Sequence, residues 1–440
     1  MHSLGGETRA EGAIAATLFA RLRTAARPDG GGRLRRPTVN DPDPRARRVV
    51  FFVFVTVFLD LLGFGIIIPL LPFYVRSLGG SAETVGFILA SFSFTQLVAT
   101  PFLGRLSDKL GRRRVILVSL AGNAAAIVLF ALATKTSLLW LLFVSRILAG
   151  ATAGNIAACQ AAIADVTKGE ARAAGMGRLG AGIGLGMVLG PVLGSSVSHI
   201  GAWAPPLAAA AMALADLVGA FFLMPETRAE RAPSTTGPTP AAPSTTLLQT
   251  LTQRRLVTVL LLYFTTFLYM TNMQVALALL THARLGWTAT EIGHVFGLFG
   301  LIMFVVQGGL IGHLTRAYGS IALVIGGSLT SAAGLLTIAL SYHAAPLVGG
   351  FVLLALGLGV VSPSLSTIAA EYAGSERQGA VLGFAQSSGG LARTVGPMLG
   401  GVLFARVAGG APFVAGATSA LVAAALAVSL RLGAKRSAGP

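Results

Sequence analysis

The chain has 440 residues, of which 54 % are hydrophobic and only 11 % are charged, and its mean hydropathy is +0.76. An average soluble domain has about 25 % charged residues, so this chain cannot cover itself with a charged surface. The composition excludes an ordinary soluble enzyme and indicates a protein with many membrane spans. The single cysteine, Cys159, excludes an internal disulfide and a cysteine-based metal site.

Twelve runs of mostly apolar residues are long enough to cross a bilayer as helices. The runs are apolar on all sides instead of striped at a period of 3.6 residues, as expected of helices in lipid. The sequence therefore predicts an all-α membrane protein with twelve transmembrane helices. Prolines inside the runs are compatible with this, because neighbouring membrane helices satisfy the backbone groups that a proline leaves free. The predicted spans are 49–75, 84–104, 114–134, 138–164, 175–197, 203–224, 255–281, 290–312, 320–341, 345–370, 379–405 and 411–431.

The basic residues are distributed unevenly between the two sides of these spans. With a cytoplasmic N-terminus, only Arg76, Lys135, Arg284 and Arg406 fall in outer loops, and nearly all the rest of the 33 lysines and arginines fall on the cytoplasmic side. Short loops rich in Lys and Arg stay in the cytoplasm, so both termini are predicted to be cytoplasmic, in an inner or plasma membrane. The net charge of +17 is then an orientation signal, which excludes nucleic acid as a partner.

Composition divides the chain into five segments. Residues 1–48, rich in Arg, Gly and Pro, are predicted to form a disordered basic cytoplasmic tail. Residues 225–254 are predicted to form a cytoplasmic linker rich in Pro, Ser and Thr. Between and after these lie an N-terminal six-helix bundle at 49–224, a C-terminal six-helix bundle at 255–431 and a cytoplasmic tail at 432–440.

The two predicted bundles repeat one another. Residues 104–111 (GRLSDKLG) recur 208 residues later as 312–319 (GHLTRAYG), and residues 190–194 (GPVLG) recur 206 residues later as 396–400 (GPMLG). A near-constant offset indicates duplication of a six-helix unit, so the bundles are predicted to be pseudo-symmetric. Two such halves that rock against each other give alternating access to a site between them.

Several motifs resemble those of the major facilitator superfamily of transporters. The stretch 104–117 (GRLSDKLGRRRVIL) resembles motif A, and Arg146 in the fourth span resembles part of motif B. The first span, 59–74 (LDLLGFGIIIPLLPFY), is similar to that of the tetracycline-efflux-like multidrug group. The resemblance covers about residues 49–431 and implies the fold of this superfamily. A set of residues in the fifth span resembles motif C of the drug:proton antiporter branch: Gly177, Gly186, Gly190, Pro191 and Gly194.

The 104–114 loop concentrates basic residues around a single acid, Asp108. Gly104 and Gly111 are expected to permit tight turns at the helix ends, and Asp108 can cap a helix or pair with a nearby arginine. Arg112 and Arg113 are the other residues predicted to take part in this loop's function. The resemblance implies that such contacts form in one conformation and break in the other, as a latch between the halves. The simpler alternative is a basic loop that only determines topology, for which Asp108 is not needed.

A glycine face on the fifth span allows another helix to approach closely. The resemblance implies that this face packs the two halves together and limits leak during antiport; ordinary packing of small residues is the alternative. The residues of this face are Gly182, Gly186, Gly190, Pro191 and Gly194.

Asp60 lies about 16 Å along the first span at 1.5 Å per residue, near the middle of the membrane. An acid there is costly and indicates a function, because it can hold a proton or a cationic substrate; a structural carboxylate bonded to nearby backbone is the alternative. The resemblance implies that Arg146 assists proton transfer, and it is expected to stabilise an ionised acid. Asp216 in the sixth span is as consistent with local packing as with function.

Polar and aromatic side chains within the spans are the candidates for substrate binding. The amides either contact substrate or hydrogen-bond between helices, and the aromatic rings can stack on a planar or cationic group. Arg393 either binds an anionic group or bonds helix carbonyls. The candidates are Gln96, Asn123, Asn155, Tyr263, Phe267, Asn272, Gln274, Gln307, Gln386 and Arg393.

Enzyme and pump signatures are absent from the sequence. There is no GxxxxGK[ST] phosphate loop and no HExxH pair, which predicts no catalytic residue, no metal and no cofactor. The resemblance implies further acids and a histidine in tetracycline exporters, at positions that here are Ala126, Thr330 and Met303. This difference argues against exchange of a tetracycline–metal complex for protons.

The sequence thus predicts a secondary active transporter rather than an enzyme, most consistent with a proton-coupled efflux antiporter of small hydrophobic compounds that uses alternating access. Its expected partners are a small-molecule substrate, protons and the lipid bilayer, and no oligomer is required. Two alternatives remain. One is a uniporter or symporter of a small metabolite or organic anion, and the other is a non-transporting scaffold or receptor on the same fold.

Overall fold

The computed structural model describes residues 44–227, 253–373 and 378–437, and the regular structure in these ranges is helical. Most of the predicted tail at 1–48, most of the predicted linker and residues 438–440 lie outside them. The first half of the chain forms α2 (Pro44–Ile67), η1 (Ile68–Leu70), α3 (Leu71–Ser77), α4 (Ala82–Leu110), α5 (Arg112–Thr136), α6 (Leu139–Ala151), α7 (Asn155–Val166), α8 (Gly169–Ser198) and α9 (Ala204–Leu223). The second half forms α11 (Arg254–Leu285), α12 (Ala289–Val305), η2 (Val306–Leu310), α13 (Ile311–Tyr318), α14 (Ser320–Leu340), α15 (Ala344–Ala373), α16 (Gln378–Arg406) and α17 (Ala411–Ser437).

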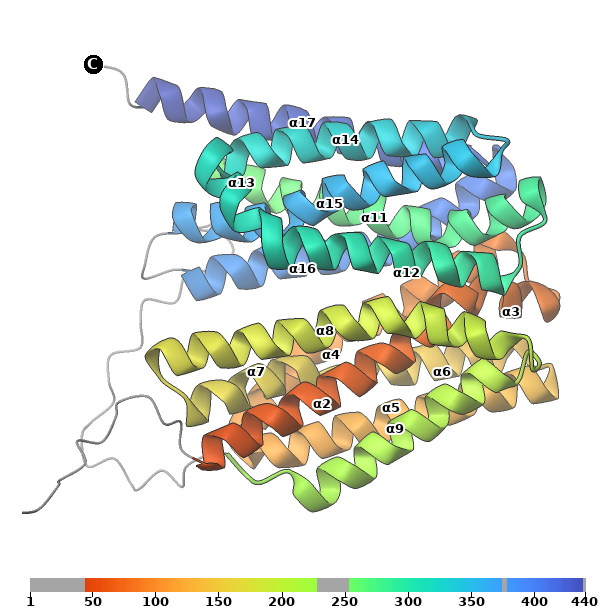
Figure 1. The fold of residues 1–440 in the computed structure, drawn as a ribbon, viewed down its shortest axis with the longest axis vertical. Helices are drawn as coiled ribbons and strands as arrows, with labels where there is room; N and C mark the ends of the chain where they lie inside the picture. The colour runs from red at the N-terminus through yellow and green to blue at the C-terminus, as the bar shows by residue number, and fades with distance from the viewer. Residues whose placement is uncertain (1–43, 228–252, 374–377, 438–440) are drawn as a thin grey trace, which may run out of the picture. The chain divides into compact units, whose positions relative to one another are not determined.

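These elements make twelve membrane helices in two six-helix bundles, α2–α9 and α11–α17 (Figure 1), which confirms the predicted fold class. Eleven helical segments of the described residues are long and apolar enough to cross a membrane. The twelfth helix, α16, has 29 residues but is less apolar, because its middle contains glycines, serines, Gln386 and Arg393. Helix α17 continues to Ser437, beyond the predicted boundary at 431.

Three membrane helices are irregular within their length. The first changes to a 3-10 turn at Ile68–Leu70, where Pro69 and Pro72 lack the N–H groups of a continuous α-helix. The fourth is interrupted between α6 and α7 at residues 152–154. The eighth has a π-helical segment at Val306–Leu310, which widens the helix around two glycines.

The glycine face of α8 packs against α2 of the same bundle. A Cβ atom built on Gly186 would lie 2.8 Å from Leu61 Cβ, and one built on Gly190 would lie 2.7 Å from Gly65 Cα. The backbones of α2 and α8 therefore lie so close together that a residue with a Cβ atom would not fit at these positions of α8. The glycines themselves therefore do not pack the two halves together in this conformation, whereas the Pro191 carbonyl oxygen lies 2.6 Å from a Cβ built on Gly293 of α12 in the second half. Spacing along one helix identifies a close contact but not the partner.

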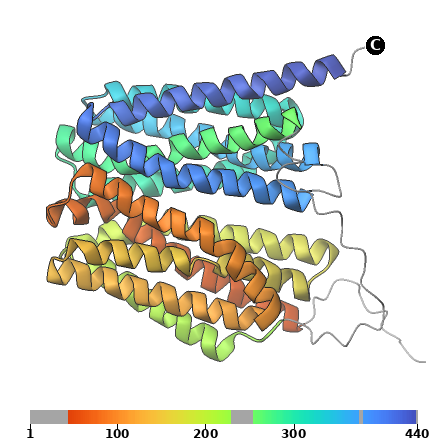
Figure 2. The ribbon, with the colours of Figure 1, turned by 180° about the vertical axis from the view of Figure 1, so that it is seen from behind.

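The two bundles meet at the end that carries the 78–81 connection, here called the Gly79 end. Helix α4 lies beside α16 there (Figure 2), and a Cβ on Gly401 of α16 would lie 2.5 Å from the Ala82 carbonyl oxygen. Arg406 Nε and Glu83 Oε1 form an ion pair at 2.6 Å between the bundles. Glycine thus brings the helices together, and the exposed ion pair adds little to the free energy of this contact.

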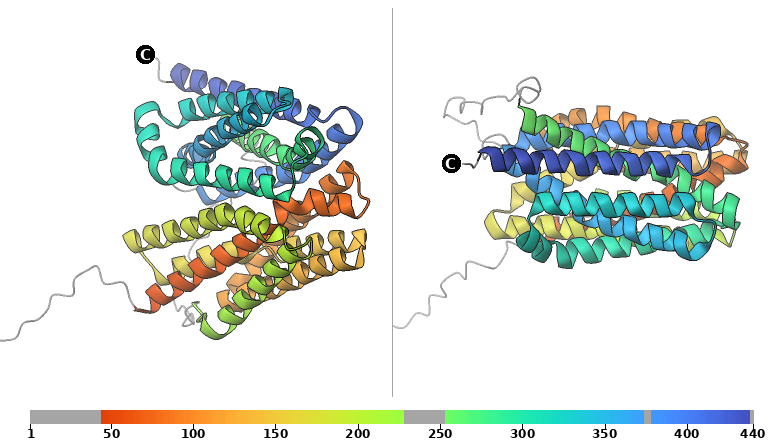
Figure 3. Two further views of the ribbon diagram at one scale, coloured as in Figure 1. Left: turned by 45° about the vertical axis from the view of Figure 1, so that its right-hand side comes forward. Right: turned by 90° about the horizontal axis from the view of Figure 1, so that it is seen from above.

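The opposite end of the bundles, which carries Gly111, is called the Gly111 end. At the Gly79 side, α12 touches α8, and a Cβ on Gly297 would lie 2.5 Å from Val192 Cγ2. Toward the Gly111 end the same two helices diverge (Figure 3, left). There a built Cβ would meet no atom within 4 Å at Gly177 and Gly180 of α8, nor at Gly308, Gly309 and Gly312 of η2 and α13, which continue α12. Helices α8 and α12 of the two bundles are therefore closer together at the Gly79 end than at the Gly111 end.

We expect Gly190→Ala to lower the unfolding temperature of the purified protein, because the added methyl group must push α8 away from α2. Such overpacking costs about 1–3 kcal/mol. Gly219→Ala in α9 is the matched control, since no atom lies within 4 Å of a Cβ at that position, and alanine favours helix over glycine by about 1 kcal/mol. Equal unfolding temperatures for the two variants, followed by tryptophan fluorescence, would contradict the packing described here.

Candidate functional site

Asp60 is held in the interior of the first bundle by two amide groups. Asn123 Nδ2 of α5 donates to Asp60 Oδ1 at 2.6 Å, and Asn155 Nδ2 of α7 donates to Oδ2 at 2.7 Å. Asn155 is buried, whereas Asp60 and Asn123 are partly exposed. Side chains from three helices thus meet at one carboxyl group. Asn123 and Asn155, which the sequence offered as substrate-binding candidates, donate hydrogen bonds to Asp60 in this structure.

The interruption of the fourth membrane helix positions Asn155. A Cβ on Gly154 would lie 2.5 Å from Leu103 Cδ1 of α4, and one on Gly150 would collide with Thr95, so the chain can bend past α4 only because both residues are glycine. Asn155 then occupies the first turn of α7, where its Oδ1 accepts a hydrogen bond from Ile156 N at 2.8 Å. The positive end of the α7 dipole therefore lies beside Asp60 and favours its ionised form.

Arg146 in α6 is buried but is not paired with an acid. Its Nη2 donates to Ser145 Oγ at 3.1 Å, and its guanidinium lies 5.1 Å from the centre of the Phe130 ring. Among the described residues no carboxylate oxygen lies within 4.0 Å of it. The cation is compensated by an aromatic face, and it does not contact Asp60 in this conformation.

Arg112 ties the 104–114 loop to its own bundle. The guanidinium pairs with Asp108 at 2.6 Å and with Asp165 at the end of α7 at 3.1 Å. The backbone N–H of Arg112 donates to Glu226 Oε1, beyond the end of α9, at 3.0 Å. Arg113 donates to the Phe221 carbonyl oxygen of α9. All of these contacts lie within the first bundle, so none of them joins the two halves in this conformation.

The two glycines of the loop differ in their roles. Gly111 makes the expected turn between α4 and α5 with φ of +100°, and Glu226 occupies the space where a side chain would point. A residue with a Cβ would be strained there. The expectation of a turn at Gly104 was wrong, because Gly104 lies inside α4.

In the second bundle, Arg393 of α16 lies over an aromatic ring. Its guanidinium is 4.8 Å from the centre of the Phe267 ring, and Phe267 in turn stacks on Tyr263 at 6.2 Å between ring centres. A Cβ on Gly390 would touch Leu97 of α4 as well as the Arg393 guanidinium. This cation therefore lies near the seam between the bundles, and no carboxylate of the described residues is within 4.0 Å of it.

The remaining substrate candidates are scattered. Asn272 is buried inside the second bundle, where its Nδ2 donates to the Pro412 carbonyl oxygen at 2.6 Å, which favours the helix-bonding role. Gln307 and Gln386 are exposed, and Gln96 and Gln274 are half-buried. Tyr263 is buried, with its hydroxyl 3.2 Å from Ser366 Oγ.

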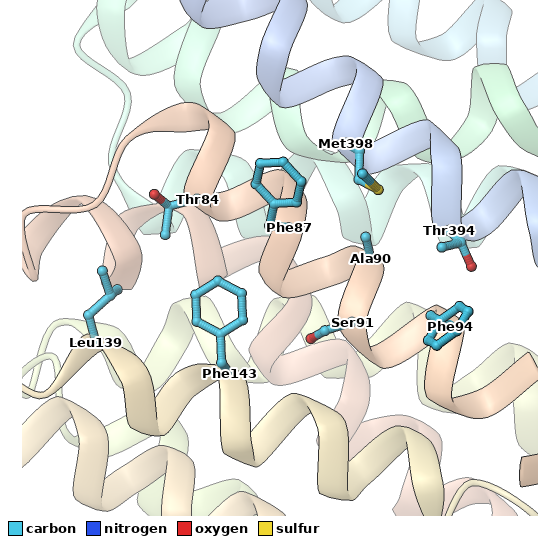
Figure 4. Close-up of a pocket in the computed structure, with 9 residues that line it drawn as sticks. All are labelled: Thr84, Phe87, Ala90, Ser91, Phe94, Leu139, Phe143, Thr394 and Met398. Carbon is cyan, nitrogen blue, oxygen red and sulfur yellow. The ribbon is translucent and has the colours of Figure 1, made fainter. Parts of the chain in front are cut away.

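An apolar groove of about 650 Å³ lies between α4, α6 and α16 (Figure 4). None of the predicted substrate residues lines it, so it is separate from the surroundings of Asp60. Two phenylalanines of α4 on its wall are themselves exposed. The groove is lined by Thr84, Phe87, Ala90, Ser91, Phe94, Leu139, Phe143, Thr394 and Met398.

Sequence reasoning missed the interruption at 152–154 and hence the reason why Asn155 reaches Asp60. The Gly150–Gly154 pair around Thr152 was the available signal, since glycine lowers helix stability. It also missed Glu226, whose carboxylate caps the first turn of α5. The described residues contain no group of three or more His, Cys, Asp or Glu that could hold a metal ion.

Two six-helix bundles of apolar helices with ionisable side chains in their interior are the architecture expected of a membrane transporter. The chain belongs to the major facilitator superfamily, whose family model matches residues 53–393 and 259–439. It is therefore a multi-pass membrane protein of a family of transporters for small-molecule substrates.

Individual relatives cover most of the chain. It is 31 % identical to the class C tetracycline resistance protein of Escherichia coli, over 82 % of this chain and 91 % of that protein. It is 32 % identical to the human major facilitator superfamily domain-containing protein 10, over 84 % of this chain and 90 % of that protein. The crystal structure of the human organic anion transporter MFSD10 matches with a TM-score of 0.65 and 28 % identity, covering 88 % of this chain and all of that one.

We expect Asn155→Ala to destabilise the protein through Asp60. Removal of the amide leaves one carboxylate oxygen of Asp60 without its donor, which costs about 1–3 kcal/mol for a neutral group and more for a charged one. In an Asp60→Asn background the same substitution is expected to cost less. Thermal unfolding of the two single variants and the double variant measures this coupling, and additive effects would contradict the contact.

Proposed function

We propose that this chain is a proton-coupled antiporter that exports small, largely hydrophobic compounds by alternating access. The observation that carries this proposal is Asp60, an acid in the interior of a membrane bundle held by two amide donors. An ionisable group is expensive at such a place and marks a pathway for protons or ions in membrane proteins. Names of relatives such as the class C tetracycline resistance protein support a drug-like substrate.

The environment of Asp60 suits reversible proton binding. Two amide N–H groups and the positive end of α7 favour the ionised carboxylate, while the apolar helices around it favour the neutral acid. Because these effects oppose each other, the group can change its charge when the conformation or the occupancy of the site changes. A proton and a positively charged substrate then compete for Asp60, and this competition couples their movements.

The orientation of the chain completes the cycle. We place both termini in the cytoplasm, following the distribution of Lys and Arg, so that the Gly111 end faces the cytoplasm and the Gly79 end faces outward. We propose that the described conformation opens toward the cytoplasm, the side on which α8 and α12 diverge (Figure 3, left). When the Gly111 end closes, the Asp108 side chain, which is 67 % exposed here, becomes available to the second bundle, and the 104–114 loop acts as the latch.

We expect Asp60→Asn to abolish uphill transport. In inverted membrane vesicles with an imposed pH gradient, the wild-type protein accumulates ethidium, whereas Asp60→Asn moves ethidium only down its gradient, because the amide binds no proton. Glu371→Gln is the matched control, since Glu371 is an exposed carboxylate at the end of α15, and it should retain uphill transport. Uphill ethidium transport by Asp60→Asn would contradict the proposed coupling and leave uniport or symport by another route.

Arg393 supports a second candidate function, transport of organic anions. Its guanidinium has an aromatic face on one side and no carboxylate partner among the described residues. An aromatic anion could pair with the cation and stack near Phe267. The resemblance to the human organic anion transporter MFSD10 supports the same substrate class.

We expect Arg393→Gln to separate these two candidates. If the substrate is an anion, the variant should lose about 10- to 100-fold in fluorescein transport, as expected for loss of a hydrogen bond to a charged group, and Arg393→Lys should recover part of it. Ethidium transport should change little. Equal fluorescein transport by the wild type and Arg393→Gln, with both proteins present in the membrane, would exclude Arg393 as an anion-binding residue.

A further inference from the structure

Asp216 of α9 is a second carboxyl group inside the first bundle. It is 4 % exposed, and its Oδ2 has no hydrogen-bond partner. No nitrogen of Lys, Arg or His among the described residues lies within 4.0 Å of it. An ionised carboxylate at this position would have no compensating charge, which is strongly unfavourable in an apolar interior.

Asp216 is connected to the Asp60 site through α2. Its side chain lies beside the Thr56 hydroxyl group, and Thr56 is itself buried. Thr56 precedes Asp60 by four residues, one helical turn, so the two side chains lie on the same face of α2. The carboxyl groups of Asp60 and Asp216 are within electrostatic reach of each other and of the Cys159 thiol of α7.

The other charged residues of the elements around Asp216 are at helix ends. On α2 they are Arg45, Arg47 and Arg48 besides Asp60, on α5 they are Arg112–Arg114 and Lys135, and on α8 they are confined to the first ten residues. Helix α9 carries no charged residue besides Asp216. The groups whose charge changes can affect Asp216 at close range are therefore Asp60 and Cys159.

We propose that Asp216 is a second proton-binding residue of the first bundle and that its protonation is coupled to that of Asp60. Two negative charges in one apolar interior repel each other, so ionisation of one carboxyl group opposes ionisation of the other. Asp216 keeps its proton while Asp60 is ionised, and a proton that returns to Asp60 makes the loss of the Asp216 proton easier. This inference deepens the proposed proton coupling and rests on it.

The test follows carboxyl protonation without any transport. Infrared difference spectra of the purified protein in lipid vesicles, recorded over a pH titration, show the C=O stretch of neutral carboxyl groups. We expect Asp60→Asn to retain a titrating buried carboxyl signal that Asp60→Asn/Asp216→Asn lacks. The midpoint of that signal should differ from the wild type by about one pH unit or more, as for interacting sites. Identical spectra for Asp60→Asn and the double variant at every pH would overturn the proposal.

Thr56→Val provides a second test if Asp216→Asn does not fold. It leaves both acids in place and removes only the hydroxyl group beside Asp216, so the signal retained in Asp60→Asn should shift in frequency in Asp60→Asn/Thr56→Val. An unchanged frequency would overturn the assignment to Asp216. A protein that shows the Asp216 signal and its coupling but moves no protons with substrate would contradict the proposed antiport and leave this second proton site intact.

Discussion

The interior of a membrane protein offers a charged group almost no solvation, and this constraint accounts for how the polar side chains of the chain are placed. Each buried ionisable group requires a local substitute for water. Asp60 has two amides and a helix end, whereas Arg146 and Arg393 have aromatic faces. Several buried hydroxyls, such as those of Thr281 and Ser364, donate to carbonyl oxygens of their own helices. Buried ionisable groups are therefore the positions at which function is to be sought.

The two bundles repeat in sequence, but among the described residues a carboxyl group held inside a bundle is found in the first one. Thr266 follows Asp60 by 206 residues and Ser331 follows Asn123 by 208, the offsets of the two repeated motifs. In the second bundle these positions form a fully buried hydroxyl cluster with Tyr269. Duplication thus preserved a polar centre in each half, and the charge is present in one of them. On the proposed mechanism, proton binding in the first bundle acts on a second bundle whose own polar centre is neutral.

Much of the fold could be predicted from sequence, because hydropathy and loop charge are local properties. The twelve helices, the two bundles and the position of prolines such as Pro191 and Pro397 inside helices follow from runs of apolar residues and from the repeat. The contact between the glycines of α8 and helix α2 could not be predicted, because it depends on how all the helices of the bundle pack together. The same holds for the break before Asn155, which depends on the close approach of α4 to Gly150 and Gly154.

The candidate site was predictable in part. Asp60 stands out because an acid is rare in an apolar span, but its partners Asn123 and Asn155 lie on two other helices and resembled substrate residues in the sequence. Arg146 of the same bundle faces Phe130 instead of an acid. Which residues contact each other depends on the tertiary structure. Sequence patterns therefore identified candidate residues, and the structure showed which of them are in contact.

The most direct test of the account is whether substrate movement drives proton movement through Asp60. The purified protein is reconstituted in vesicles that contain a pH indicator, and an ethidium gradient is imposed with no initial pH gradient. The account predicts a change of internal pH in the direction opposite to ethidium flux for the wild type, and none for Asp60→Asn. Ethidium flux by the wild type without a pH change, or the same pH change with Asp60→Asn, would contradict it.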